Sequence, residues 1–193
     1  MTTAKDILDL IKEKDVKYVD VRFTDIRGKM QHVTFDIDLV DDEFLTDGTM
    51  FDGSSIVGWK AINESDMKLR PDLASAYIDP FYQQTTLCLF CDVLNPDTNT
   101  PYNRDPRSIA KAALNHVKAA GIGDTVYFGP EAEFFLFDDV RWSTSGHNTG
   151  YAFDSTELPV NSSKEYAEGN MGHRPGPKGG YFPVNPVDSA QDL

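Results

Sequence analysis

Long apolar runs and positive charge are both scarce in this chain of 193 residues. Lys and Arg number 18 against 31 Asp and Glu, so the formal net charge is −13. This composition argues against nucleic acids and anionic membrane surfaces as partners, because both require basic patches. No apolar stretch approaches the ~20 residues of a membrane span, and no signal peptide is visible at the start. We therefore expect a cytoplasmic protein with neither a membrane nor a nucleic acid as partner.

Cysteine is also scarce, with two residues in the chain. Cys88 and Cys91 form a C-x-x-C pattern inside an alternating, strand-like segment. Residues i and i+3 of a strand point to opposite faces, so the two thiols diverge. No second pair completes a zinc site. We expect ordinary reduced cysteines.

The first hundred residues combine one clear helical pattern with several strand patterns. Thr3 and Asp6 are spaced as a capping box, and the apolar stripe after them predicts a helix over 4–14. The acidic stretch 36–48 predicts a short helix that ends at Gly48. One early helix with several strands suits a β-grasp-like α+β domain. The predicted strands cover residues 18–23, 29–35, 76–79 and 85–93.

A stretch rich in Pro, Asn and Thr, residues 95–101, marks a boundary by composition. Asp105 is a suitable N-cap and Pro106 a suitable first residue for the next helix, which we expect Gly121 to end. Further along, residues 140–176 are polar and irregular, and we interpret them as a long hairpin excursion.

The stretch from Gly129 to Phe137 places two glutamates inside an aromatic and apolar run. The pattern predicts a strand over about 126–137 that is covered on both faces. Glu131 and Glu133 then share one face, because side chains on a strand alternate with a period of two. Buried carboxylates need a cation, so the pair could hold one hard cation or two adjacent ones. Two salt-bridged glutamates near a strand end explain the same pattern, and the residues alone leave both readings open.

Two short segments have the composition of loops that approach a ligand closely. Residues 52–55 read Asp-Gly-Ser-Ser, and residues 179–181 read Gly-Gly-Tyr with a phenol beside a flexible backbone. Glycine permits a close backbone approach because it lacks a side chain. Taken alone, each segment is more simply read as an ordinary turn.

Taken together, three segments resemble bacterial type I glutamine synthetases. Segment 128–135 (FGPEAEFF) is similar to the family's first metal-ligand strand. Segment 51–67 resembles the family's N-terminal loop, and segment 178–183 resembles a later catalytic segment. The three occur in the family's order and spacing, and the resemblance covers the whole chain. Family members are much longer, so we expect this chain to be the N-terminal part of a larger enzyme.

The resemblance implies an α+β fold in two parts. Residues 1–103 are expected to form the β-grasp-like N-terminal domain. Residues 104–193 are expected to form the first part of the catalytic domain, an antiparallel sheet with flanking helices that is truncated here. The main ATP and glutamate contacts are expected beyond residue 193, so the chain alone is expected to be inactive.

The resemblance also implies roles for individual residues. Asp52 helps to bind ammonium and to remove a proton from it, from a loop that reaches the active site of the neighbouring subunit. Tyr181 lines the ammonium pocket, while Ser55 and Asp66 belong to the substrate-binding region. A carboxylate suits this chemistry, because ammonium has no lone pair and must lose a proton before it attacks.

By the same resemblance, Glu131 helps to bind the ion nearer the ATP phosphates and Glu133 the ion at the glutamate side. Mg²⁺ or Mn²⁺ is expected at both sites, because carboxylate oxygens suit hard ions. Each of the two sites needs further ligands from beyond residue 193. The two ions supply charge neutralisation for phosphoryl transfer.

The implied activity is ATP-dependent ligation of ammonia to L-glutamate through γ-glutamyl phosphate, which serves nitrogen assimilation. A homo-oligomer of two stacked hexameric rings with shared active sites is also implied. One alternative is a related γ-glutamyl-amine ligase, but the set of Asp52, Ser55 and Tyr181 favours ammonia. The other is a non-catalytic relative kept for assembly or regulation, which would be expected to lose Glu131 or Glu133.

Overall fold

The computed structural model describes residues 2–134, 136–154 and 184. By its internal contacts the chain divides into two compact units, Met1–Tyr127 and Phe128–Leu193. Among the described residues, none of the helices combines the length and the apolar character that a membrane crossing requires.

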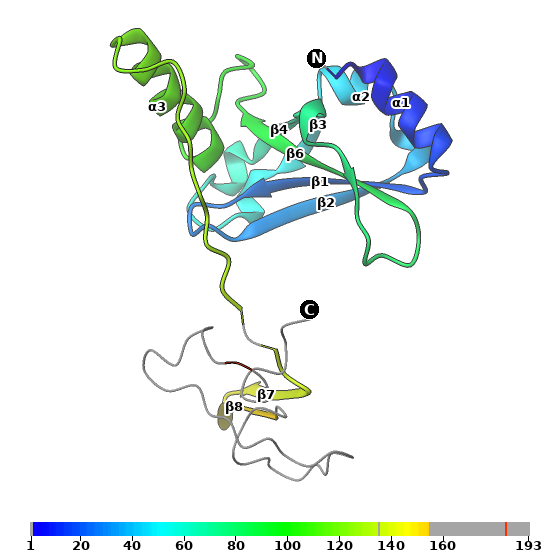
Figure 1. The fold of residues 1–193 in the computed structure, drawn as a ribbon, viewed down its shortest axis with the longest axis vertical. Coiled ribbons are helices and arrows are strands. Elements are labelled where there is room, and N and C mark those ends of the chain that lie inside the picture. The colour runs from blue at the N-terminus through cyan, green and yellow to red at the C-terminus, as the bar shows by residue number, and fades with distance from the viewer. Residues whose placement is uncertain (1, 135, 155–183, 185–193) are drawn as a thin grey trace. The chain divides into compact units, whose positions relative to one another are not determined.

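The first unit is built around a mixed sheet of six strands (Figure 1). The sheet order is β2-β1-β6-β4-β3, and β5 pairs separately with β6. β1 and β6 are parallel, whereas the other pairs are antiparallel. β6 therefore joins the β1–β2 pair to the β3–β4 pair. The strands are β1 (Tyr18–Thr24), β2 (Met30–Asp36), β3 (Thr49–Asp52), β4 (Asp66–Pro71), β5 (Tyr77–Ile78) and β6 (Thr86–Leu94).

Two helices, α1 (Ala4–Glu13) and α2 (Asp42–Thr46), lie side by side in the first unit (Figure 1). α1 begins with the predicted capping box: the Thr3 hydroxyl accepts the Asp6 N–H at 3.2 Å, and the Asp6 carboxylate accepts the Thr3 N–H at 2.7 Å. The carboxylate of Asp41 caps α2 by accepting the N–H of Phe44 at 2.8 Å. The predicted early helix, acidic helix and β1–β2 hairpin are confirmed.

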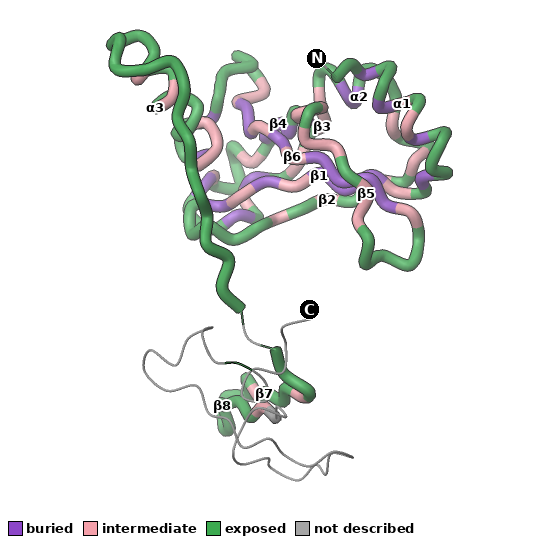
Figure 2. Tube along the Cα trace, in the orientation of Figure 1, coloured by how far each residue is buried: buried purple, intermediate pink, exposed green. Residues whose placement is uncertain are grey.

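The hydrophobic core forms where α1 and α2 pack on one face of the sheet. Ile7 of α1 clusters with Val19 and Val21 of β1, and with Leu87 and Leu89 of β6. All four strand residues are fully buried. Figure 2 shows this burial as purple segments along β1, β4 and β6. β6 lies inside the sheet, and its almost continuous burial indicates that both of its faces are covered.

β3 and β4 are two strands that we did not predict. Met67 and Leu69 of β4 are fully buried, and the ammonium of Lys68 between them pairs with Asp47 at 2.8 Å. The alternation of apolar residues with Lys68 was a strand signal. Gly48 precedes β3 with φ 98°, and a Cβ there would lie 2.2 Å from the Leu69 carbonyl oxygen. Only glycine suits that conformation and that close approach.

The face of β1 opposite the core carries a buried polar cluster around Asp20. Its carboxylate accepts hydrogen bonds at 2.6 Å from Arg22 Nε and Thr34 Oγ1, and lies 2.6 Å from His32 Nδ1. Arg22 also pairs with Asp79 at 2.9 Å. Burial raises the pKa of Asp20, but the hydrogen bonds outweigh burial and leave the pKa below its ordinary value. The sheet therefore contains an ionised, well-partnered carboxylate.

A third helix, α3 (Pro106–Ala119), begins where it was predicted. The buried carboxylate of Asp105 accepts the N–H groups of Arg107 and Ser108 at 3.2 and 3.1 Å and the Ser108 hydroxyl at 2.6 Å. Arg107 Nε then donates to Asp92 of β6 at 2.9 Å. No residue of α3 is buried, and the side chain of Ile109 is 56% exposed. Polar contacts, not apolar burial, attach the start of α3 to the sheet.

The described part of the second unit contains one antiparallel hairpin, made by β7 (Asp139–Ser145) and β8 (Asn148–Asp154). The predicted hairpin is confirmed over these two strands. The remainder of the segment predicted as a hairpin, residues 155–176, lies outside the described residues.

Candidate functional site

A tight turn at the end of β3 forms the predicted ligand loop. Asp52 is the last residue of β3, and Gly53–Ser55 form one turn of 3-10 helix. The Gly53 N–H donates to the Ser65 carbonyl at 2.7 Å. A Cβ on Gly53 would lie 2.4 Å from the sulfur of Met67, which is buried in β4. The glycine is therefore required for the turn to pack this closely on β4.

The carboxylate of Asp52 is held mainly through one of its two oxygens. Oδ1 accepts the Ser54 N–H at 2.8 Å and the Ser54 hydroxyl at 2.6 Å. Oδ2 is 3.5 Å from the Ser55 hydroxyl, a long contact. The Ser54 hydroxyl is the main cause that lowers the pKa of Asp52 below its ordinary value. Asp52 is thus both ionised at neutral pH and exposed to solvent.

The structure also brings Asp66 to this turn. Asp66 is the first residue of β4 and lies directly opposite Asp52 in the register of the β3–β4 pair. Directly opposed residues of an antiparallel pair point to the same face, and like charges at such positions are destabilising. Both side chains are exposed, and Ser55 follows in the turn. This end of the β3–β4 pair therefore presents two exposed acidic side chains on one face.

The predicted strand around the two glutamates is wrong. Residues 125–134 form neither helix nor strand, and Glu131 and Glu133 are exposed. A strand must pair its backbone N–H and C=O groups with a neighbouring strand. No strand in the described part of the chain pairs with this segment. The apolar pattern alone was therefore insufficient to form a strand here.

Glu131 and Glu133 fit a divalent cation as part of a ligand set. Carboxylate oxygens are the donors that Mg²⁺ and Mn²⁺ prefer. Within residues 2–134 and 136–154, however, no group of three or more His, Cys, Asp or Glu side chains is placed to hold a metal. Two carboxylates alone leave most positions around such an ion to other ligands.

The predicted residues fall into three groups by location. Asp52, Ser55 and Asp66 meet at the end of β3 and β4 in the first unit. Glu131 and Glu133 belong to the second unit. Tyr181 lies outside the described residues.

Ser54 is a residue of this turn that we did not predict as part of the site. Its hydroxyl and N–H both bind the Asp52 carboxylate, and its neighbour Gly53 sets the close approach to β4. The available signal was local: an Asp followed two residues later by Ser is typical of a side-chain-capped turn.

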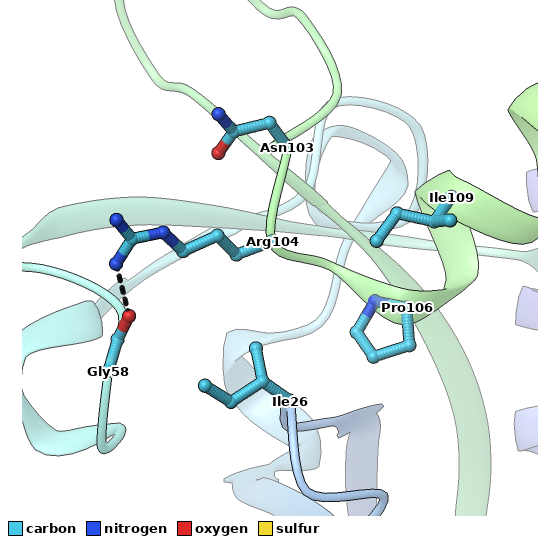
Figure 3. Close-up of a pocket in the computed structure, with 6 residues that line it drawn as sticks. All are labelled: Ile26, Gly58, Asn103, Arg104, Pro106 and Ile109. Carbon is cyan, nitrogen blue, oxygen red and sulfur yellow. Dashed lines mark hydrogen bonds between the residues drawn. The ribbon is translucent and has the colours of Figure 1, made fainter.

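A separate open cavity of about 500 Å³ lies between the β1–β2 turn, the loop after β3 and the start of α3 (Figure 3). Its wall is mostly apolar, and the guanidinium of Arg104 donates to the carbonyl of Gly58. None of the predicted site residues lines it, so it adds nothing to the Asp52 turn. The lining residues are Ile26, Gly58, Asn103, Arg104, Pro106 and Ile109.

The sheet order and the helices α1 and α2 define the first unit as a β-grasp domain of the α+β class. A family profile described as "Glutamine synthetase, beta-Grasp domain" matches residues 15–96. A second profile, "Glutamine synthetase, catalytic domain", matches residues 103–193. The chain therefore belongs to the glutamine synthetase family.

Relatives agree with this assignment. Glutamine synthetases of Bradyrhizobium diazoefficiens and Azorhizobium caulinodans are 64% and 62% identical to this chain over all 193 residues. The chain spans 41% of the length of each of these relatives. A cryo-EM structure of Plasmodium falciparum glutamine synthetase matches this chain with a TM-score of 0.75 at 23% identity. The match covers the whole of this chain and 38% of the Plasmodium chain. At that identity the match shows the fold alone.

Proposed function

We propose that this chain is part of an enzyme that ligates ammonia to L-glutamate with ATP, giving L-glutamine, ADP and phosphate in nitrogen assimilation. The observation that carries the proposal is the Asp52 turn, an exposed, ionised carboxylate in a chain 64% identical to a glutamine synthetase. The chain spans 41% of that relative, so the proposal concerns the whole enzyme.

The Asp52 turn is suited to the ammonium step. Asp52 attracts the ammonium ion and takes one of its protons, which creates the lone pair that attacks. Asp66 opposite adds negative charge, and the Ser55 hydroxyl offers a further polar contact. We assign Tyr181 to the wall of the same pocket by its place in the family motif.

The preceding step makes the acceptor for ammonia. The side-chain carboxylate of glutamate attacks the γ-phosphate of ATP and forms γ-glutamyl phosphate, from which ammonia later displaces phosphate. Bound Mg²⁺ or Mn²⁺ would neutralise charge on the transferring phosphoryl group. We assign Glu131 to the ion nearer ATP and Glu133 to the ion at glutamate, with the remaining ligands contributed from beyond residue 193.

We further propose a cytoplasmic homo-oligomer of two stacked hexameric rings. Residues 1–103 form its N-terminal domain and residues 104–193 the first part of its catalytic domain. In this assembly Asp52 of one subunit completes the active site of its neighbour, so each site combines the Asp52 turn of one chain with Glu131 of the next. Such a head-to-tail contact must close into a ring, because an open one builds filaments.

Mixed assemblies of the full-length enzyme test this arrangement. Asp52→Ala and Glu131→Gln homo-oligomers should each be nearly inactive, since every site carries the defect. When the two variants are co-expressed in equal amounts, about one interface in four combines an intact Asp52 with an intact Glu131. Activity should therefore recover to about a quarter of wild type. Confirmed mixed assemblies without recovery would place both residues in the same chain's site.

The choice of nitrogen substrate is tested by an assay of the full-length enzyme with glutamate and ATP. We expect glutamine formation with ammonium, and little product with methylamine in its place. Preference for methylamine would indicate a γ-glutamyl-amine ligase, and no product with either would indicate a non-catalytic relative. The 193-residue chain assayed alone should form no glutamine.

A further inference from the structure

The two oxygens of the Asp52 carboxylate have different surroundings. Oδ1 receives two donors from Ser54, at 2.8 Å from the backbone N–H and 2.6 Å from the hydroxyl. Oδ2 lies 3.5 Å from the Ser55 hydroxyl, which is a long contact. Two short hydrogen bonds on Oδ1 fix the plane of the carboxylate, and the longer contact to Oδ2 leaves that oxygen with lone-pair capacity for a further donor.

Three short 3-10 turns in this chain show that the Ser54 hydroxyl is not needed to form such a turn. In each turn an Asp caps the N–H two residues later: Asp36 caps Asp38 at 3.0 Å, Asp52 caps Ser54 at 2.8 Å and Asp72 caps Ala74 at 3.1 Å. Only at Asp52 does the capped residue also donate a side-chain hydroxyl to the same oxygen. The backbone hydrogen bond alone is therefore sufficient to form this type of turn. The additional hydrogen bond from the Ser54 hydroxyl serves to orient the Asp52 carboxylate.

The backbone beneath this carboxylate is also fixed. The Gly53 N–H binds the Ser65 carbonyl at 2.7 Å, and Ile56, which closes the turn through its N–H to the Gly53 carbonyl at 3.2 Å, is buried. A turn whose backbone is anchored at both ends can hold a side chain within the narrow range of positions that a reacting group requires.

Building on the proposed function, we propose that Ser54 is a positioning residue for the ammonium step: it holds Oδ1 of Asp52, so that Oδ2 beside the Ser55 hydroxyl is the oxygen that contacts ammonium. Asp66, in register opposite Asp52, is the charged group facing Asp52 from β4. The proton released by ammonium moves from its nitrogen to Oδ2. Ser54 itself does not touch the substrate.

The experiment compares Ser54→Ala with the rescue variant Ser54→Thr, which keeps a hydroxyl. Thr46→Ala is the control, because it removes an exposed hydroxyl that donates to a backbone carbonyl in α2. Carbon-13 NMR titration of the Asp52 carboxyl in the 193-residue chain measures the pKa of Asp52, which reports the hydrogen bonds that Oδ1 accepts from Ser54. Steady-state kinetics of the full-length enzyme measure KM for ammonium, glutamate and ATP, and the pH profile.

We expect Ser54→Ala to raise the pKa of Asp52 toward its ordinary value and to raise KM for ammonium about three- to tenfold, the range that one hydrogen bond supports. The acid limb of the pH profile should move to higher pH, while KM for glutamate and ATP stays unchanged. Ser54→Thr should restore both quantities, and Thr46→Ala should change neither.

The proposal is overturned if the titration of Asp52 does not move, or if it moves while KM for ammonium stays constant. It is also overturned if Ser54→Ala prevents folding, because the hydroxyl would then be a structural requirement. Asp52→Asn separates these results from the proposed function: if that variant keeps full ammonia-dependent activity, the assignment of Asp52 itself has failed.

Discussion

The two units of this chain hold their acidic residues in different ways. In the first unit, Asp20, Asp52 and Asp105 each accept several hydrogen bonds from nearby turns or paired strands. In the described part of the second unit, Glu131 and Glu133 lie exposed on a segment without secondary structure. A carboxylate that caps its own turn is oriented by local contacts, whereas the sequence motif around Glu131 and Glu133 did not by itself place these residues on a strand.

The same comparison separates roles within the first unit. Asp20 and Asp105 are fully buried and surrounded by donors, so they serve the fold. Asp52 is exposed, and its Oδ2 has a longer contact, 3.5 Å to the Ser55 hydroxyl, than the two hydrogen bonds to Oδ1. Exposure with a fixed orientation, not acidity itself, is what distinguishes Asp52, the carboxylate that we propose as functional, from Asp20 and Asp105.

Removing the charge of Asp52 while keeping its cap should have the largest effect. In the full-length enzyme, Asp52→Asn should lower kcat by roughly 10²–10⁴-fold, the contribution typical of an acid–base group. Thermal stability should be almost unchanged, because Asn caps a turn about as well as Asp. The matched control is Asp36→Asn, which alters the same kind of turn and should leave activity intact. Equal losses in both variants would contradict the special role of Asp52.

Breaking the buried cluster tests how far the first unit depends on its own polar contacts. Asp20→Asn should lower the free energy of unfolding by about 3–5 kcal/mol, the cost of breaking a buried ion pair. Urea unfolding of the chain at pH 7 measures it. Asp9→Asn is the control, since its partner Lys5 is exposed on α1 and the change should cost well under about 1 kcal/mol.

The lowered pKa of Asp20 also predicts a pH dependence. The folded-state pKa lies below the unfolded value of about 3.9, so the stabilisation is complete above that value. It is lost as the pH falls through the folded-state pKa. Asp20→Asn should therefore flatten the acid limb of the stability curve, and an unchanged limb would contradict this assignment.

Glu133→Gln tests the segment that forms neither helix nor strand. In the full-length enzyme it keeps shape and removes a ligand charge, so activity should fall by at least about tenfold at low Mg²⁺, since even changes outside the ligand shell cost ~10–100-fold. Raising the Mg²⁺ concentration should recover part of the loss. Glu13→Gln on α1 is the control. Unchanged activity at low Mg²⁺ would make Glu133 a structural residue.

The smallest effect is expected at the cap of α3. Asp105→Ala should cost about 1 kcal/mol of unfolding free energy, as for other helix N-caps, and Asp105→Asn should cost less. Urea unfolding distinguishes the two variants. A cost for Asp105→Asn as large as for Asp105→Ala would show that the charge, not the cap, is what stabilises the start of α3.

Local patterns in the sequence predicted much of the first unit. The capping box at Thr3, the alternation in β1 and the Asp105-Pro106 start of α3 each depend on residues a few positions apart. Each of these patterns can be recognised in one short segment, without knowledge of the rest of the fold. The segments at 51–67, 128–135 and 178–183 together indicated the family for the same reason.

The tertiary structure decided what depends on residues distant in the sequence. The register that sets Asp66 opposite Asp52 and the donors that strand β2 supplies to Asp20 follow from which strands pair. The strand predicted around Glu131 failed on the same ground, because apolar alternation makes a strand possible and only a paired neighbour satisfies its backbone. The sequence by itself determined the residues and turns of this protein, and sheet pairing determined which of those residues meet.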